Sequence, residues 1–162
     1  MQLEKISAFR SELAIVETIE EIKHLDTKAS ALAEIARKQK MGKSVQDEVG
    51  EFRCDIEAKK GAWLDEYFPQ GGTGSNQYKK EQRSDGSTLA DEGISKNESS
   101  NARLVSKEAE QVAEAIEEIK QDDKKVVTPS AVVSLVRNKK RKIRVEETEQ
   151  PNLDGIYRVI YA

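Results

Sequence analysis

Cysteine and aromatic residues are scarce in this sequence. The 162 residues contain one Cys, and only 5% are Phe, Trp or Tyr. A single Cys excludes an internal disulfide and a zinc site built from several cysteines. Hydrophobic residues make up 36%, which is too little for one large core that uses the whole chain. A compact β-sandwich or barrel is therefore excluded, and helices that each bury one apolar stripe are favoured.

Long hydrophobic runs are absent as well. No stretch of about 18 apolar residues exists that could span a membrane, and the start of the chain shows no apolar core typical of a signal peptide. We therefore expect no membrane partner and a cytoplasmic location, where the reducing environment suits an unpaired Cys. Asp plus Glu number 30 and Lys plus Arg 27, for a net charge of −3, although the two signs are segregated along the chain.

Residues 1–68 are predicted to form a helical hairpin that resembles a coiled coil. Apolar residues recur three or four positions apart, which indicates amphipathic helices, and Lys59 interrupts the third stripe. The stripes are Leu3, Ile6, Phe9, Leu13 and Val16; Ile22, Leu25, Ala29, Leu32 and Ala36; and Val45, Val49, Phe52, Ile56 and Trp63. Long helices with short connections fold back antiparallel. The stripes either pair within one hairpin or also mediate a homodimer.

Local signals mark the ends of these helices. Thr18 and Glu21 form a capping box, in which a hydroxyl and an acid satisfy the first backbone donors. Gly42 follows a basic run and is typical of a helix C-terminus. Ser44 with Asp47 predicts the start of a third helix. Residues 69–87, rich in Gly, Ser and Gln, are predicted to be a flexible linker.

Residues 88–144 are predicted to form a small helical bundle of the helix-turn-helix type. A short helix at 89–92 would end at Gly93, Ser95 would cap a helix reaching about Val105, and Ser106 would cap another. Residues 122–125 read as a loop. Thr128 followed by Pro129 predicts a further helix, because Pro is favoured at the first helical position.

Six cations in the eight positions from 137 to 144 are the strongest electrostatic feature. They are Arg137, Lys139, Lys140, Arg141, Lys142 and Arg144. Such a run can contact phosphates of nucleic acid with salt-sensitive affinity. The alternative is a solvated helix end, favoured by the helix dipole.

The turn at Gly93 predicts a second nucleic-acid contact. A recognition helix that begins there would point short polar and cationic side chains at DNA. The candidate DNA-binding residues are Ser95, Lys96, Asn97, Ser99 and Arg103. The alternative is an ordinary helix pair with a Gly cap.

Residues 145–162 are predicted to be a linker and an isolated C-terminal β-strand. The charge reverses to acidic after Arg144, and Pro151 breaks the chain. The last eight residues, 155–162, are rich in β-branched and aromatic side chains. A lone strand needs a sheet to pair with.

The segment 154–162, Asp-Gly-Ile-Tyr-Arg-Val-Ile-Tyr-Ala, resembles the stretch that leads into the Asp-Pro-Pro-Trp motif of bacterial and phage adenine methyltransferases. Their family is named for the seventy-kilodalton subunit of the messenger-RNA adenine methyltransferase. Residues 18–64 resemble the helical leader of its phage-type members. Residues 88–100 resemble its short helix-turn-helix, which is similar to that of ParB-type partition proteins.

The resemblance implies the DNA-binding, targeting region of an adenine (N6) DNA methyltransferase. The cofactor of that family is S-adenosylmethionine, and its catalytic motif would follow Ala162. We therefore expect no catalytic, cofactor or metal site here and no methyl transfer by this chain alone. The alternatives are a stand-alone phage or plasmid DNA-binding or adaptor protein, and a structural coiled-coil protein.

Other chemistry-bearing residues predict no site. Gly42-Lys43-Ser44 imitates the end of a phosphate-binding loop, but Arg37 stands where that loop requires Gly. His24 is the only His and lies off the apolar stripe, as does Cys54. We expect His24 on the surface and assign no role to Cys54.

Overall fold

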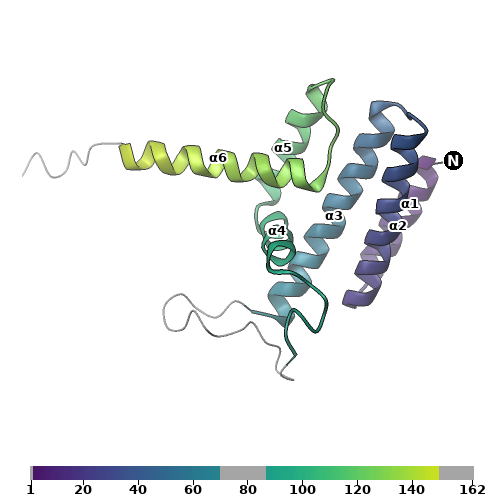
Figure 1. The fold of residues 1–162 in the computed structure, drawn as a ribbon, viewed down its shortest axis with the longest axis horizontal. Helices are drawn as coiled ribbons and strands as arrows, with labels where there is room; N and C mark the ends of the chain where they lie inside the picture. Colours follow the sequence, from purple (N-terminus) through teal and green to yellow (C-terminus); the bar gives the residue numbers. More distant parts are fainter. Residues whose placement is uncertain (1, 70–86, 150–162) are drawn as a thin grey trace, which may run out of the picture.

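The computed structural model describes residues 2–69 and 87–149, which form six α-helices and no strand (Figure 1). The helices are α1 (Gln2–Ile15), α2 (Ile19–Lys38), α3 (Lys43–Tyr67), α4 (Lys96–Lys107), α5 (Ala109–Gln121) and α6 (Pro129–Glu149). The predicted mainly α fold is confirmed. Nearly all of the predicted linker, and the whole predicted C-terminal strand, lie outside the described residues.

Three helix starts follow the predicted local chemistry. Thr18 and Glu21 form the capping box of α2, since each side chain binds backbone of the other residue. The Ser95 hydroxyl accepts the Glu98 N–H at the start of α4, at 3.2 Å. Thr128 Oγ1 accepts the Ala131 N–H at the start of α6. Each bond satisfies a donor that the helix itself leaves unpaired.

The end of α2 differs from the prediction. Gly42 does not end this helix; it is the N-cap of α3, with a φ of −54°. Lys40 takes the left-handed position instead, with a φ of 49°. The Met41 N–H reaches back to the Ala36 carbonyl and the Lys40 N–H to the Arg37 carbonyl, the bond pattern that usually recruits Gly.

The predicted helix at 89–92 is instead one hydrogen-bonded turn. It closes with the same pattern as α2, because the Ile94 N–H donates to the Leu89 carbonyl and the Gly93 N–H to that of Ala90. Here the left-handed residue is Gly93, as expected of a terminator. The predicted cap at Ser106 is wrong, since α4 continues to Lys107 and α5 begins at Ala109.

Helices α1 and α2 pack on one side of α3 (Figure 1). The α2 stripe predicted from the sequence is buried in this core, with exposures from 0 to 8%. Phe9 of α1 stacks with Phe52 of α3, with ring centroids 6.2 Å apart. The described residues of the stripes therefore pack against one another within the chain.

The two halves of the sequence pack on the same long helix, α3. At Gly61, an added Cβ would lie 2.1 Å from the Ala102 carbonyl oxygen of α4. At Gly50, it would lie 1.9 Å from the Val127 carbonyl oxygen, just before α6. A second core lies where α3 faces α4, α5 and α6, and it joins Cys54 of α3 to apolar residues of those three helices. The blocks 1–68 and 88–144 thus share both cores.

We predict that Gly61→Ala destabilises the protein by about 3 kcal/mol, because a methyl group would overlap backbone that cannot move aside. Gly42→Ala is the matched control, since no atom lies within 4 Å of its Cβ position. Alanine is a weaker N-cap than glycine, which lowers stability, but it also lowers the entropy of the unfolded chain, which raises stability. The two effects oppose each other, so little change in the free energy of unfolding is expected. Urea unfolding followed by circular dichroism measures both. Equal stabilities of the two variants would contradict the close packing of α3 on α4.

Lys40→Gly is expected to stabilise the fold by about 0.5–1 kcal/mol. Glycine removes the cost of a left-handed L-residue but loses more entropy on folding, and the first effect is larger. Lys40→Ala is the control, because it removes the same charge and keeps the Cβ. Thermal melts measure both variants. An equal rise in melting temperature would show that the gain comes from the lost charge and not from relief of backbone strain.

Candidate nucleic-acid interface

Helix α6 is anchored along its first half and projects from the other helices along its second (Figure 1). Val132, Val133 and Val136 are buried in the core that α5 contributes to. The helix continues to Glu149, so the basic run 137–144 lies inside it and not at its end. The interpretation of the run as a helix terminus favoured by the dipole is therefore wrong.

The cations nearest the body already have partners. Arg137 donates to Asn101 Oδ1 at 2.8 Å and to Ser100 Oγ at 3.3 Å, which ties α6 to α4. Lys139 pairs with Glu118 at 3.2 Å and Glu114 at 3.5 Å. These acids hold the pKa of Lys139 above its usual value, chiefly through the hydrogen bond to Glu118.

Lys140 pairs with Glu108, the residue between α4 and α5. Helix α5 and its start therefore supply the carboxylates that face Lys139 and Lys140. Both ammonium groups are partly neutralised within the chain, so the basic run presents less positive charge near the body than its sequence indicates.

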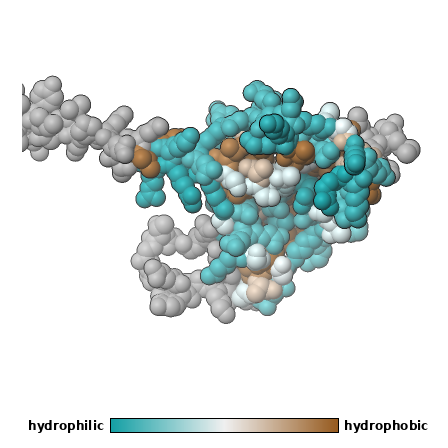
Figure 2. All heavy atoms as spheres, turned by 45° about the horizontal axis from the view of Figure 1, so that its top comes forward, coloured by the Kyte–Doolittle hydropathy of each residue, from teal (hydrophilic) through white to brown (hydrophobic). Residues whose placement is uncertain are grey.

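The projecting cations are different. Arg141, Lys142 and Arg144 are exposed, and within the described part of the chain no carboxylate forms an ion pair with Arg141 or Lys142. Ile143 and Val145 beside them are 49% and 52% exposed. Figure 2 shows this part of α6 as mainly hydrophilic with a small hydrophobic patch. The charge that can meet an anionic partner is thus concentrated on this segment.

The predicted recognition helix, α4, has only part of its residues on the surface. Ser95 caps the helix, and Lys96 and Asn97 are exposed. Ser99 and Arg103 are each only 3% exposed, so the prediction that they contact DNA is wrong for this fold. Their side chains lie on the face of α4 that packs against α3.

Arg103 is an anchor within the fold. Its guanidinium donates to the carbonyls of Leu64, at 3.2 Å, and Phe68, and pairs with Asp65 at 3.1 Å. These groups lie in the last turn of α3 and at its C-cap, where helix carbonyls lack partners. The cation therefore closes the end of α3 and joins it to α4, a role that its place in the predicted recognition helix did not indicate.

Sequence reasoning also missed Lys60. It is 1% exposed and pairs with Glu98 at 2.9 Å, Glu57 at 3.1 Å and Asp26 at 3.8 Å. Burial alone would lower its pKa, but the three carboxylates of α2, α3 and α4 outweigh burial and raise it. A signal existed, because Lys60 falls four residues after Ile56 and three before Trp63, on the buried face.

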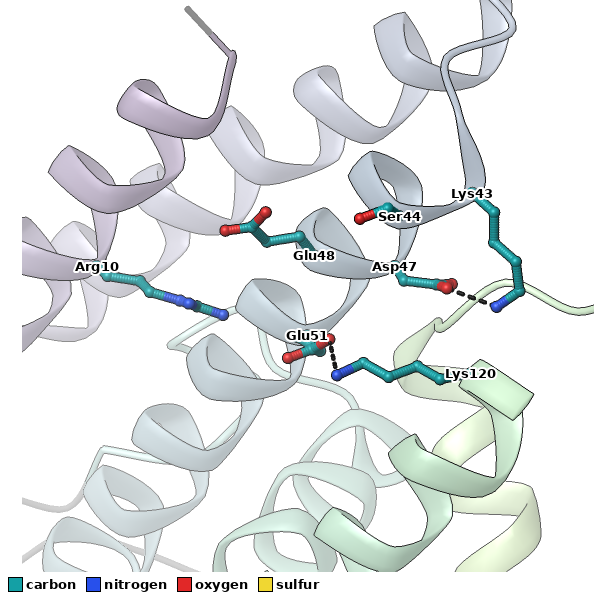
Figure 3. Close-up of a pocket in the computed structure, with 7 residues that line it drawn as sticks. All are labelled: Arg10, Lys43, Ser44, Asp47, Glu48, Glu51 and Lys120. Atoms are coloured by element: carbon teal, nitrogen blue, oxygen red, sulfur yellow. Dashed lines mark hydrogen bonds and ion pairs between the residues drawn. The ribbon is translucent and has the colours of Figure 1, made fainter. Parts of the chain in front are cut away.

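A crevice between α1, α3 and α5 gathers charges of both signs (Figure 3). Lys43 pairs with Asp47 at 2.5 Å, and Lys120 pairs with Glu51 at 2.6 Å. Asp47 Oδ1 also accepts the buried N–H of Val127 at 2.8 Å. These charged groups pair with one another, and Asp47 holds the segment before α6 on α3. The charges of the crevice therefore have a structural role, and we assign no ligand to it. Lys43 and Ser44, the end of the imitated phosphate loop, lie here.

Two further predictions concern the His and the Cys. His24 is exposed, as expected. Cys54 is 3% exposed in the second core, although it lies off the stripe. The stripe faces α1 and α2, whereas Cys54 faces the α4–α6 side that periodicity within α3 cannot reveal.

The described helices build no pocket for S-adenosylmethionine of the α/β type, because residues 2–69 and 87–149 contain no parallel sheet. No metal-ligating group of three or more His, Cys, Asp or Glu side chains gathers among them. No helix described by the structure combines the length and apolarity needed to cross a membrane. The chain matches no protein-family model, no curated protein and no solved structure.

Cys54 is predicted to resist alkylation in the folded protein. Burial, followed by the nearby Asp55 and Glu57, raises the pKa of its thiol to about 12. At about pH 8 the thiolate fraction is then roughly 1 in 10,000, against about a quarter for a free thiol. Iodoacetamide labelling should be more than about a thousandfold slower than in concentrated guanidinium chloride. Equal rates would contradict the burial of Cys54.

Proposed function

We propose that this chain binds DNA through the projecting half of α6, and that it acts as the targeting region of an adenine methyltransferase of the family it resembles. The observation that carries the proposal is the exposure of Arg141, Lys142 and Arg144 on a helix segment that extends beyond the body. A single helix that projects with cations can approach a phosphate backbone without a clash from the rest of the fold.

The ion pairs of α6 favour the distal cations as the phosphate contacts. A cation that meets a phosphate releases counterions from the DNA, and this release drives binding. Lys139 and Lys140 would first have to leave Glu114, Glu118 and Glu108. Among the described residues no carboxylate pairs with Arg141 or Lys142, so affinity should depend on them more strongly.

The contacts of α4 are proposed to be secondary. Lys96 and Asn97 are exposed beside the cap at Ser95, and short polar side chains at a helix N-terminus suit phosphates and base edges. With Ser99 and Arg103 buried, too few side chains remain for extensive base reading. We therefore propose binding with little sequence preference.

The methyltransferase part of the proposal is supported by sequence similarity at 88–100 and 154–162. S-adenosylmethionine supplies the transferred methyl group in that family, and we assign no step of that transfer to the described helices. A stand-alone DNA-binding or adaptor protein would use α6 in the same way. Codons for Asp-Pro-Pro-Trp directly after that of Ala162 in the source gene would favour the methyltransferase.

The test compares two double variants of α6 that remove equal charge. Arg141→Gln with Lys142→Gln should reduce the slope of log affinity against log salt by about 1.8, that is, about 0.9 for each lost contact. Lys139→Gln with Lys140→Gln should reduce it by less than about half of that, because these cations are engaged within the chain. Fluorescence anisotropy with a labelled duplex at several salt concentrations measures the slopes.

The same titrations can refute the proposal. The proposal would be refuted if the wild-type protein bound no duplex at low salt. Equal slopes for wild type and the Arg141/Lys142 variant would show that the projecting cations make no phosphate contact, and a protein partner of the exposed Ile143 and Val145 would then be favoured.

A further inference from the structure

A second groove lies away from the projecting half of α6, between α2, α3 and the segment that leads into α6. It has a volume of about 420 Å³ and is lined on the α2 side by Ser30, Ala33, Glu34 and Arg37. Gln46, Gly50 and Arg53 of α3 and residues 126–128 complete it. This volume falls within the range of small-molecule sites, about 300–1,000 Å³.

Two arginines in this groove lack carboxylate partners among the residues that the structure describes. No ion pair to Arg37 or Arg53 is formed by any residue in the described ranges 6–69 and 87–145. The Nε of Arg53 is shielded from solvent and has no hydrogen-bond acceptor among these residues. A shielded cationic N–H without an acceptor is costly, so this group calls for an acceptor that the described residues do not provide.

The other groups of the groove do not cancel this charge. Among the described residues Glu34 is the only acid that lines it, and this carboxylate pairs with Lys38 at 2.7 Å. The Gln46 amide donates to the Met41 carbonyl. The contrast with the crevice of Figure 3 is direct, because there each lysine has its own carboxylate.

We propose that this groove is an anion site that binds a phosphate group between Arg37 and Arg53. The planar guanidinium fork matches phosphate oxygens and binds them by charge-assisted hydrogen bonds. The groove's volume of about 420 Å³ leaves room beside the anion for the rest of a small phosphorylated molecule. The site is independent of the proposed DNA contacts of α6.

The test is isothermal titration calorimetry of the full chain with inorganic pyrophosphate in a phosphate-free buffer. Wild-type protein should show one saturable site. Arg37→Gln and Arg53→Gln should each weaken binding about tenfold or more, the loss of one charge-assisted bond pair. Arg53→Lys keeps the charge but not the fork, and should also bind more weakly. Thermal melts identify any variant that fails to fold, and Arg37, which is exposed, tests the site even if Arg53 variants do not fold.

A control separates this groove from general attraction to cations. Arg141→Gln with Lys142→Gln removes two cations of α6 that do not line the groove, and this variant should bind pyrophosphate nearly as wild type does. Failure of wild type to bind, or equal losses in the control and arginine variants, would overturn the proposal and leave water as the acceptor for Arg53.

A competition arm identifies the source of the phosphate. Duplex binding that saturating pyrophosphate weakens, with the effect lost in Arg37→Gln, would assign the groove to backbone phosphates of DNA. Duplex binding unaffected by pyrophosphate would assign it to a free phosphorylated molecule. Either result supports the site, and pyrophosphate binding decides the matter even if no duplex binds.

Discussion

Two glycines of α3 allow other segments of backbone to lie directly on this helix, and the rest of the fold depends on that contact. Gly61 admits the backbone of α4 at Ala102, and Gly50 admits the segment before α6 at Val127. Side chains at either position would hold these segments apart. These two contacts also position α5 and α6, because α5 follows α4 and α6 follows the segment at Val127. The second core, which α3 shares with α5 and α6, holds both helices in place.

Buried charges fix how these elements meet. The three acids around Lys60 come from α2, α3 and α4, and Arg103 of α4 binds the carbonyls that α3 leaves unpaired at its end. A buried ion pair contributes little net stability, but loss of one partner leaves an uncompensated charge. Such contacts therefore select one arrangement of helices over others that would bury the same apolar area.

The cations fall into two groups, according to whether a neighbouring side chain pairs with them. Those close to the body are engaged by acids of α5 and Glu108 or by polar groups of α4, whereas no described carboxylate pairs with Arg141 or Lys142. Arg37 and Arg53 escape neutralisation among the described residues for a different reason, since Glu34, which lines their groove, pairs with Lys38 instead. Charge available for binding is set by neighbours in space, which is why a count of cations along 137–144 overstates the positive charge that is free of partners near the body.

The sequence by itself determined the helical class, the caps at Thr18, Ser95 and Thr128, and the buried stripes of α1 and α2. These depend on interactions within three or four residues, which periodicity reports directly. Only the tertiary structure decided which side of α4 is buried, and with it the loss of Ser99 and Arg103 as DNA contacts. It also decided the burial of Lys60 and Cys54 and the partners of Lys139 and Lys140. Each of these depends on residues more than twenty positions away, whose approach no local pattern records.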